Sequence, residues 1–389
     1  MPPRPRSGTY VTTSTAGETV RAFLPDPLPP VPPLALLPSD LDLLERANRA
    51  LGRLDGITDL LPDPGLFVYV YLRKEAVLSS QIEGTQSSLS DLLLHESDEA
   101  PGVPVDDVRE VSNYLAALSH GLRRMREGFP LSLRLIKEIH EVLLSQCRGS
   151  EKQPGEFRRS QNWIGGTRPG NARYVPPPPD RLMNCLGPFE LFLHDQPERT
   201  PLLIKAALAH VQFETIHPFL DGNGRLGRLL ITLLLCAEGA LAEPTLYLSL
   251  FFKTHREVYY DLLQRVRTHG EWEEWLRFFL DGVQTTAEQA VATARAIKGL
   301  FQADWGRIQG LGRAAGSAHQ VHEVLKHHVI LSMPRTGHLT GLSAPTVSST
   351  YVRLVELGVV REITGRQRGQ IYAYGPYLDL LSQGTEPQR

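Results

Sequence analysis

The chain has 389 residues, and its 41 Lys and Arg against 43 Asp and Glu give a net charge of −2. This length predicts two or three domains, and a 41% apolar fraction excludes a wholly disordered chain. Near-neutral charge argues against a chain that is entirely a nucleic-acid binder. Three scattered cysteines predict neither a disulfide framework nor a CxxC zinc site. Because we find no long apolar run and no signal-peptide core, we expect a cytoplasmic protein without a membrane partner.

The N-terminal third is expected to be a proline-rich arm followed by helices. Residues 1–38 contain many prolines and predict an extended arm rather than a packed domain. Residues 39–127 predict an N-terminal helical region, because apolar side chains recur at three- and four-residue spacing. The first expected helix begins at Ser39, the second covers about 66–80, the third ends near 95 and the fourth covers 106–127. A loop is expected at 96–105. A further helix is expected at 132–146, with Ser132 as its cap.

The middle of the chain also reads as helical, apart from one irregular stretch. Residues 150–180 are rich in Gly, Pro, Asn and Arg, which predicts a hairpin and a loop. The expected helices after it are 181–195, 201–215, 225–238, 252–268, 271–281 and 283–304. Since strands and helices do not alternate, the main body is expected to be mainly α.

The C-terminal segment differs in charge and pattern. Residues 307–371 contain eight Lys or Arg and three Asp or Glu, a net charge of +5 against −7 for the rest. Helices are expected at 319–331, 335–341 and 344–357, with strands at 359–363 and 370–374 around a turn at 365–369. This order predicts a winged helix-turn-helix domain over 319–389, preceded by a linker helix over 286–318.

The densest polar cluster is the segment from His217 to Arg228, HPFLDGNGRLGR, which lies between two expected helices. A glycine-rich turn that opens a helix presents several backbone N–H groups to one anion. Arg225 and Arg228 share one face of that helix and suit phosphate oxygens, and Asp221 suits Mg²⁺. His217 can act as a base at neutral pH. The segment therefore predicts a site for phosphorus chemistry.

Two common nucleotide-binding folds are excluded around this segment. Gly222, Gly224 and Gly227 match G-x-G-x-x-G literally, but a helix rather than a strand is expected before them, so a Rossmann unit is excluded. The sequence also has no G-x-x-x-x-G-K-[ST] stretch and hence no P-loop.

The segment resembles the Fic (Fido) family motif H-x-F-x-[D/E]-G-N-G-R-x-x-R, and every fixed position is met from His217 to Arg228. The resemblance extends over about 40–285, with the catalytic core at 128–285 and a flap that begins near Gly155-Glu156-Phe157-Arg158. It implies a Fic-type α-helical core with a β-hairpin flap. It also implies transfer of AMP from ATP to a Ser, Thr or Tyr hydroxyl of a protein. Gly224 favours AMP transfer over phosphorylation, because the phosphorylating branch carries Lys there.

The resemblance also implies residue roles. His217 would take the hydroxyl proton, and Asp221 would hold Mg²⁺ against the phosphates, with Arg228 on the γ-phosphate. Trp163, Ile164 and Gly165 of the flap would dock the target as an added strand. The residues implied to line the ATP site are Glu83, His217, Gly222, Asn223, Gly224, Arg225, Leu226, Gly227, Arg228 and Tyr260.

A second motif implies autoinhibition. Residues 79–84, SSQIEG, match the Fic inhibitory pattern [S/T]-x-x-x-E-[G/N] through Ser79, Glu83 and Gly84. In the family this glutamate pairs with the second arginine of the catalytic motif, here Arg228. A carboxylate on that guanidinium competes with the γ-phosphate for the same donors.

Several alternatives stay open at this level. Some Fic proteins use the same site to remove AMP from a modified protein, which is an alternative enzyme activity. The alternative that is not an enzyme is a DNA-binding regulator whose core only senses nucleotide. The winged helix is expected to bind DNA through 344–357 or to mediate dimerisation or protein contact. The target is an unknown protein or the chain itself, and a homodimer is compatible with the family. Taken singly, His217 also reads as a core or capping histidine, and Tyr259 as core packing.

Overall fold

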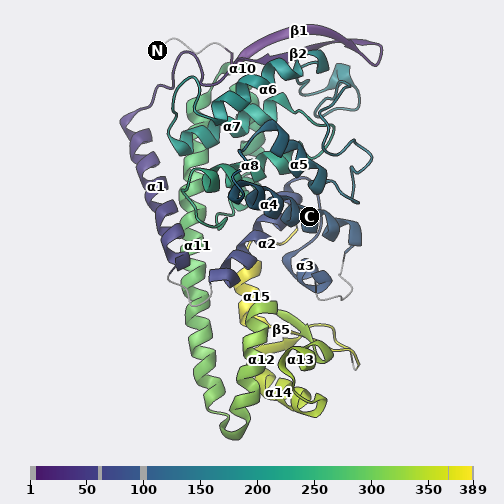
Figure 1. The fold of residues 1–389 in the computed structure, drawn as a ribbon, viewed down its shortest axis with the longest axis vertical. Helices are drawn as coiled ribbons and strands as arrows, with labels where there is room; N and C mark the ends of the chain where they lie inside the picture. Colours follow the sequence, from purple (N-terminus) through teal and green to yellow (C-terminus); the bar gives the residue numbers. More distant parts are fainter. Residues whose placement is uncertain (1–5, 60–63, 97–102, 367, 388–389) are drawn as a thin grey trace.

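The computed structural model describes residues 6–59, 64–96, 103–366 and 368–387. It has a large helical body and a smaller C-terminal part, and the long helix α11 (Trp272–Gln309) runs from one into the other (Figure 1). Helices of the N-terminal region pack on this body: α1 (Pro38–Asp59) lies along α11, and α2 (Pro64–Ile82) contacts α4 (Val105–Arg126). Between α2 and α4 lies the short helix α3 (Leu89–Glu96).

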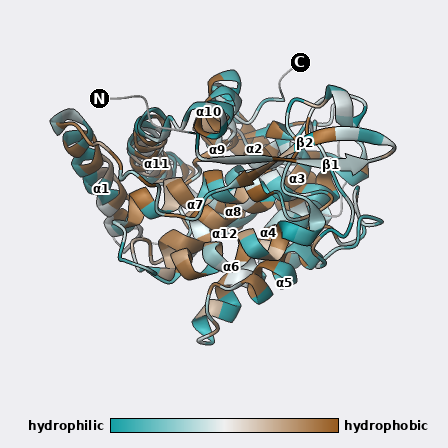
Figure 2. Cartoon of the chain, turned by 90° about the horizontal axis from the view of Figure 1, so that it is seen from above, coloured by the Kyte–Doolittle hydropathy of each residue, from teal (hydrophilic) through white to brown (hydrophobic). Residues whose placement is uncertain are grey.

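The body is built around helix α7 (Leu202–Ile216), in which every residue from Leu203 to Ile216 is buried. Apolar residues on all sides of a helix predict such a central position, and Figure 2 shows hydrophobic colouring along it. Around α7 lie α5 (Leu133–Leu143), α6 (Leu182–Leu193), α8 (Asn223–Ala237), α9 (Ser249–Thr254) and α10 (Arg256–His269). The expected Ser132 cap is confirmed, since its hydroxyl accepts the Leu135 N–H. The polar motif therefore connects a fully buried helix to α8.

The prediction of an extended arm over residues 1–38 is wrong for residues 8–25. These form an antiparallel hairpin of β1 (Gly8–Thr15) and β2 (Glu18–Pro25) around a two-residue turn. Ala16 and Gly17 have φ values of 51° and 78°, which suits a tight hairpin turn. Ala22 and Phe23 are buried, and the Phe23 N–H donates to the Val175 carbonyl. Period-two alternation was present in the sequence, but the prolines that flank it dominated the composition.

Two other expectations differ from the structure. The hairpin expected within 150–180 is reduced to one antiparallel bridge between Ile164 and Tyr174. The 3₁₀ turn Pro169–Asn171 lies in the loop that this bridge closes, and the turn Pro179–Arg181 follows it. The helices expected at 271–281 and 283–304 are one continuous helix, so the boundary expected at residue 285 falls inside α11. Gly282 lies inside this helix without breaking it. The helix packs there so closely on Phe251 that a Cβ would lie 2.8 Å from the ring.

The C-terminal part begins after a 3₁₀ turn (Gly312–Ala314) and places four helices against a small sheet. Its elements are α12 (Ala315–His328), β3 (Ile330–Ser332), α13 (Met333–Thr340), α14 (Ala344–Glu356), β4 (Val360–Glu362), β5 (Ile371–Tyr374) and α15 (Gly375–Ser382). The sheet order is β3-β5-β4, and both pairs are antiparallel. Strand β3 and helix α15 were not predicted from the sequence. Most of the loop expected at 96–105 lies outside the described residues.

Within the part of the chain that the structure describes, no helix combines the length and hydropathy needed to cross a membrane.

Candidate active site

His217 is held by its backbone at the C-terminal end of α7. It adopts a left-handed conformation (φ 49°, ψ 60°), its N–H donates to the Phe213 carbonyl, and its own carbonyl accepts from Arg158 Nε at 2.9 Å. Arg158 is buried, and its backbone N–H donates to the Pro218 carbonyl. Arg158, at the start of the flap, therefore holds the backbone from which the imidazole projects.

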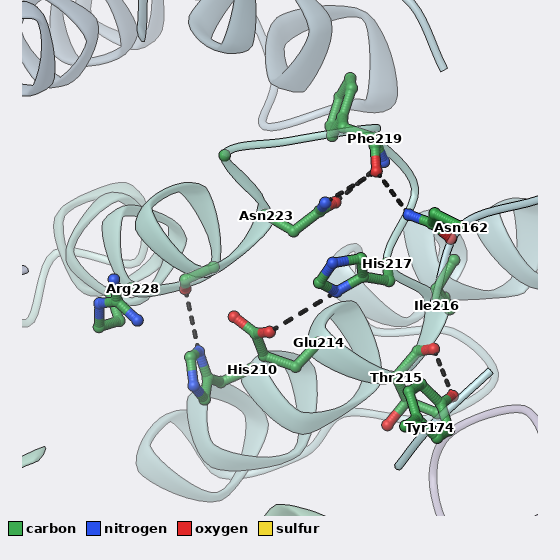
Figure 3. Close-up of polar contacts among 12 residues, drawn as sticks. Asn162, Tyr174, His210, Glu214, Thr215, Ile216, His217, Phe219, Asn223 and Arg228 are labelled. Atoms are coloured by element: carbon green, nitrogen blue, oxygen red, sulfur yellow. Dashed lines mark hydrogen bonds and ion pairs between the residues drawn. The ribbon is translucent and has the colours of Figure 1, made fainter. Parts of the chain in front are cut away.

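Asn223 braces the loop that follows. Its Oδ1 accepts the Phe219 N–H at 2.9 Å, and its Nδ2 donates to the Phe219 carbonyl at 2.8 Å (Figure 3). Asn162, next to the flap bridge, donates to the same carbonyl at 3.0 Å. The side chain of Asn223 is therefore occupied inside the turn, which closes the loop over residues 219–223.

The loop ends in the N-terminus of α8, whose first backbone N–H groups have no intrahelical acceptor. Gly222 precedes the helix with φ 75°, which glycine adopts without strain. A Cβ on Gly224 would overlap the Glu83 carboxylate, so that carboxylate lies directly against the start of the helix. The predicted anion nest is thus formed, and a protein carboxylate lies at it.

Arg228 and Glu83, which the two motifs predict to be partners, form an ion pair. Arg228 Nη2 lies 2.7 Å from Glu83 Oε1, and its Nε and Nη2 donate to the hydroxyl and carbonyl of Ser79 at 2.9 and 2.8 Å. Burial raises the pKa of Glu83, but the Arg228 guanidinium outweighs it, and the pKa lies below its ordinary value. Glu83 and Gly84, with φ 101°, form the turn that ends α2.

Arg225 and its neighbours lie deeper than the sequence suggested. Arg225 is 1% exposed, and its Nη1 lies 2.8 Å from Glu110 Oε1 on α4. Leu226 is fully buried, and the Gly227 carbonyl lies 3.1 Å from His210 Nδ1. These three residues, expected at the ATP site, are therefore engaged within the protein behind the nest.

Asp221 is the carboxylate at the mouth of the loop. Its side chain is 38% exposed, with Oδ1 accepting the Gly222 N–H at 2.6 Å. Among the described residues, no group of three His, Cys, Asp or Glu side chains could hold a metal. Mg²⁺ is commonly bound by one or two carboxylates together with substrate phosphates. A single exposed carboxylate beside an anion nest fits that mode of binding.

Two buried residues next to His217 and its loop, Glu214 and His140, were not predicted from the sequence. Glu214 lies on α7 with Oε2 4.0 Å from His217 Nδ1, and burial raises its pKa to about 7. His140 stacks on Phe219 with centroids 3.7 Å apart, accepts the Gly155 N–H at Nδ1 and contacts the Asp221 carbonyl through Nε2. The i, i+3 spacing of Glu214 and His217 was the one signal in the sequence.

Electrostatics keep the histidines neutral. Burial, and next Arg158 and Arg267, lower the pKa of His217 to about 3. Burial lowers the pKa of His140 to about 4 and that of His210 to about 3. A neutral imidazole is the form that can accept a proton.

The remaining expected residues divide between core and surface. Tyr259 is buried and hydrogen-bonded to His210, whereas Tyr260 is partly exposed and burial raises its pKa to about 12. Ile164 exchanges two backbone hydrogen bonds with Tyr174, Trp163 packs on the cluster of Val20, Ala22 and Val175, and Gly165 is exposed.

Comparison with known proteins identifies these regions. Residues 41–123 match the model of the Fic/DOC family N-terminal region, and residues 130–235 match that of the Fic/DOC family. Among curated proteins, Protein adenylyltransferase Fic of Aedes aegypti is 33% identical over 211 residues, 53% of this chain and 39% of that protein. The same-named protein of Culex quinquefasciatus is 31% identical over 255 residues, 62% of this chain and 47% of that protein.

The chain thus spans less than half the length of these curated relatives. A solved Fic family protein from Desulfovibrio desulfuricans G20 shares the fold, with a TM-score of 0.59 and 21% identity. That match covers 88% of this chain and 98% of the other. Residues 41–123 and 130–235 are thus similar in sequence to the two parts of the Fic/DOC family.

Proposed function

We propose that this chain is a protein adenylyltransferase that transfers AMP from ATP to a hydroxyl of a target protein, and that Glu83 holds it in an inhibited state. The names of its relatives and the complete motif support the reaction. The observation that carries the proposal is the ion pair of Arg228 and Glu83 at the N-terminus of α8.

The reaction follows from the groups around the nest. Neutral His217 accepts the proton of a Ser, Thr or Tyr hydroxyl, whose oxygen forms a bond to the α-phosphorus while the bond to pyrophosphate breaks. Backbone N–H groups at the start of α8 bind phosphate oxygens, and Arg228 binds the γ-phosphate. Mg²⁺ held by Asp221 supplies further neutralisation of phosphate charge. Positioning and charge stabilisation provide most of the rate in such a transfer.

Inhibition follows from competition for one guanidinium. Arg228 Nε and one N–H of Nη2 donate to Ser79, and the other N–H of Nη2 donates to Glu83 Oε1 at 2.7 Å. A γ-phosphate that needs the same donor must displace the carboxylate or bind elsewhere. ATP then binds with its α-phosphorus away from His217.

Labelled ATP tests the reaction. Wild type, Glu83→Gly and His217→Ala are incubated with ATP labelled in the α- or γ-phosphate, with Mg²⁺. The proposal expects α-label on protein, most with Glu83→Gly and none with His217→Ala. Transfer of γ-label would indicate a kinase instead. Release of AMP from modified protein, with no transfer by Glu83→Gly, would favour the reverse reaction.

Target docking is proposed at the flap bridge. The backbone N–H and carbonyl of Ile164 are hydrogen-bonded to Tyr174, at 2.8 and 3.1 Å. In an antiparallel pair the neighbouring residues direct these groups the other way, so the backbone of Trp163 is the one offered to a target strand, whereas Gly165 turns away with a φ of 67°. Substitution of Trp163 by Pro, which removes that N–H, should slow modification of a target and leave ATP hydrolysis or self-modification less affected.

A separate role is proposed for the C-terminal part, which we interpret as a winged-helix domain over 315–382. Val352 and Val355 on α14 are 56% and 43% exposed, and Arg361 of the wing is paired with Asp379. These features favour contact with a protein, including a second copy of the chain, over DNA binding. An electrophoretic shift that weakens steeply with salt would instead support DNA.

A further inference from the structure

Glu214 is a buried carboxyl that faces the inner nitrogen of His217 (Figure 3). The two residues lie three apart, at the last turn of α7, with Glu214 Oε2 4.0 Å from His217 Nδ1. The side chains are 9% and 18% exposed. Both are therefore largely removed from water before any substrate arrives.

Each side chain also has an unsatisfied polar atom. Within the described part of the chain, His217 Nδ1 and Glu214 Oε1 have no hydrogen-bond partner. Leaving buried donors and acceptors unpaired is unfavourable, and catalytic hydrogen bonds often shorten only when substrate binds. A small rotation of either side chain would bring the carboxylate within hydrogen-bond distance of Nδ1.

We propose that Glu214 is a positioning residue for His217, which holds the imidazole with its proton on Nδ1 and leaves Nε2 free for the target hydroxyl. This inference rests on the proposed function. During the reaction the hydroxyl proton moves to Nε2, the new oxygen–phosphorus bond forms, and pyrophosphate leaves. The imidazolium then has two N–H groups, and the one at Nδ1 donates to Glu214.

The charges around the pair show what the carboxylate contributes. Arg158 and Arg267 oppose protonation of His217, and Glu83 favours it from the end of α2. Glu214 itself lies in the fields of Arg228, Glu83 and Arg267. In the active enzyme Glu83 has left Arg228, so Glu214 becomes the carboxylate that favours imidazolium.

The first test is the pH dependence of AMP transfer in a Glu83→Gly background. Glu214→Gln should lower the maximal rate about tenfold to a hundredfold and remove the acidic limb that follows ionisation of Glu214, because burial raises the pKa of that carboxyl to about 7 and only its charged form stabilises imidazolium. Glu214→Asp should restore part of the maximal rate and part of the pH dependence. A uniform loss of rate, with the limb unmoved, would show a merely structural residue and overturn the proposal.

The second test does not depend on activity. Ring ¹⁵N shifts of His217 should show the Nδ1–H tautomer in the wild-type protein and more Nε2–H in Glu214→Gln. An Nε2–H tautomer in the wild type would overturn the proposal even if AMP transfer were found. Conversely, absence of transfer by Glu83→Gly would contradict the proposed function and leave this measurement intact.

An independent observation concerns the segment that follows α15. Gln81 Nε2, near the end of α2, donates to the Thr385 carbonyl at 2.8 Å and to the Ser87 carbonyl at 2.9 Å. Lys253 Nζ on α9 donates to the Gly384 carbonyl at 3.0 Å and to the Glu386 carbonyl. Thr385 is 1% exposed, whereas Gln383 and Glu386 are exposed, so the segment 383–386 is fixed to the body through Thr385 and through its backbone carbonyls.

This contact reaches the inhibitory turn. Gln81 lies between Ser79, which holds Arg228, and Glu83, which pairs with it. Helix α15, which leads into the segment, also contacts α2 and α3. We infer that segment 383–386 is a brace that stabilises the inhibitory turn, so that movement of the C-terminal part changes the strength of inhibition. This inference also rests on the proposed function.

Truncation after Gln383 and the substitution Gln81→Ala test the brace, with Gln383→Ala as the exposed control. Both should raise AMP transfer severalfold, with no further increase when combined with Glu83→Gly. Hydrogen exchange over residues 79–87 should also become faster. Unchanged transfer and exchange in both variants would overturn the inference. If Glu83→Gly alone gave no transfer, the proposed function would fail instead, and the exchange measurement would still decide the brace.

Discussion

At the scale of single residues, the site is organised around the donors of Arg228. Ser79 holds the guanidinium through two contacts, and Glu83 takes one end of the fork. Charge-assisted contacts of this kind are stronger than neutral hydrogen bonds, and a bidentate fork adds directional specificity. The proposed inhibited state would therefore depend on a residue that positions the arginine as well as on the carboxylate that pairs with it.

Ser79→Ala tests this division. Loss of the hydroxyl removes one acceptor from Arg228, worth about 1 kcal/mol, so the guanidinium should move more freely. We expect AMP transfer to rise severalfold, by less than in Glu83→Gly. Ser80→Ala is the matched control, because Ser80 is equally buried and its hydroxyl has no partner among the described residues. Equal rates for both alanine variants would contradict the assignment.

Asn223→Ala tests the loop brace. The change removes both contacts with Phe219, at 2.9 and 2.8 Å, and leaves the buried Phe219 N–H without its acceptor, while the Phe219 carbonyl keeps its bond from Asn162. We expect the free energy of unfolding to fall by about 1–3 kcal/mol and AMP transfer to be lost. Urea denaturation and the labelled-ATP assay measure the two effects. A variant with full transfer would show that the loop keeps its shape without this amide.

The motif predicted some of these contacts and not others. Pairing of Glu83 with Arg228 could be expected from two short motifs. Helical spacing placed Arg225 beside Arg228, but the acceptor for Arg225 is Glu110, on a helix far away in the sequence. Which neighbour a buried side chain meets is decided by tertiary packing, so periodicity alone could not separate the two arginines. Glu214 was missed because its burial is likewise a tertiary property.

At the scale of elements, the β1–β2 hairpin supports the flap. Phe23 is fully buried, packs on Tyr10 and Tyr174, and its N–H donates to the Val175 carbonyl. Glu18 adds an ion pair with Arg168 at 2.8 Å. The hairpin and the flap are thus one packed unit beside the loop that contains His217.

Phe23→Ala should therefore destabilise both parts of that unit. Truncation of a buried phenylalanine costs about 3–5 kcal/mol, and we expect faster hydrogen exchange over residues 164–175 as well as a lower midpoint in urea. Thr12→Ala, on the exposed side of β1, is the control. If exchange in the flap did not change, the hairpin would be independent of it.

Element types were more predictable than their limits. Three- and four-residue spacing identified most helices, since an amphipathic face is a local property. The hairpin was hidden by flanking prolines, and α11 was divided at Gly282, where packing against Phe251 overrides the weak helix preference of glycine. The short strand β3 and helix α15 depend on contacts within the C-terminal part and carry little local signal.

At the scale of the whole molecule, buried histidines make stability dependent on pH. In the folded protein the pKa of His140 is about 4, and those of His210, His217 and His322 are about 3, against an ordinary 6.5. Between these values the unfolded chain binds protons that the folded protein does not, so stability falls as the pH is lowered. Two buried glutamates act in the opposite direction, because the pKa values of Glu75 and Glu214 are raised from 4.5 to about 7.

The balance between these groups makes the free energy of unfolding change measurably with pH. Around pH 5.5, these four histidines each gain a proton on unfolding and the two glutamates each lose one, so the six groups together take up about two protons. Burial also lowers the pKa values of His319 and His328, which adds to the uptake. We expect the free energy of unfolding to decrease from pH 6.5 to pH 5, and His322→Phe to reduce the uptake by about one proton. Stability that increased over this range would contradict these pKa directions.

The rate of AMP transfer by Glu83→Gly relative to wild type, at saturating ATP and Mg²⁺, tests the central claim most directly. If Glu83 and the γ-phosphate compete for Arg228, the variant should transfer AMP at least about tenfold faster, since an interaction of roughly 1.4 kcal/mol corresponds to that factor. The increase should disappear when His217→Ala is added. Equal rates for Glu83→Gly and wild type, in protein that binds ATP, would contradict the account.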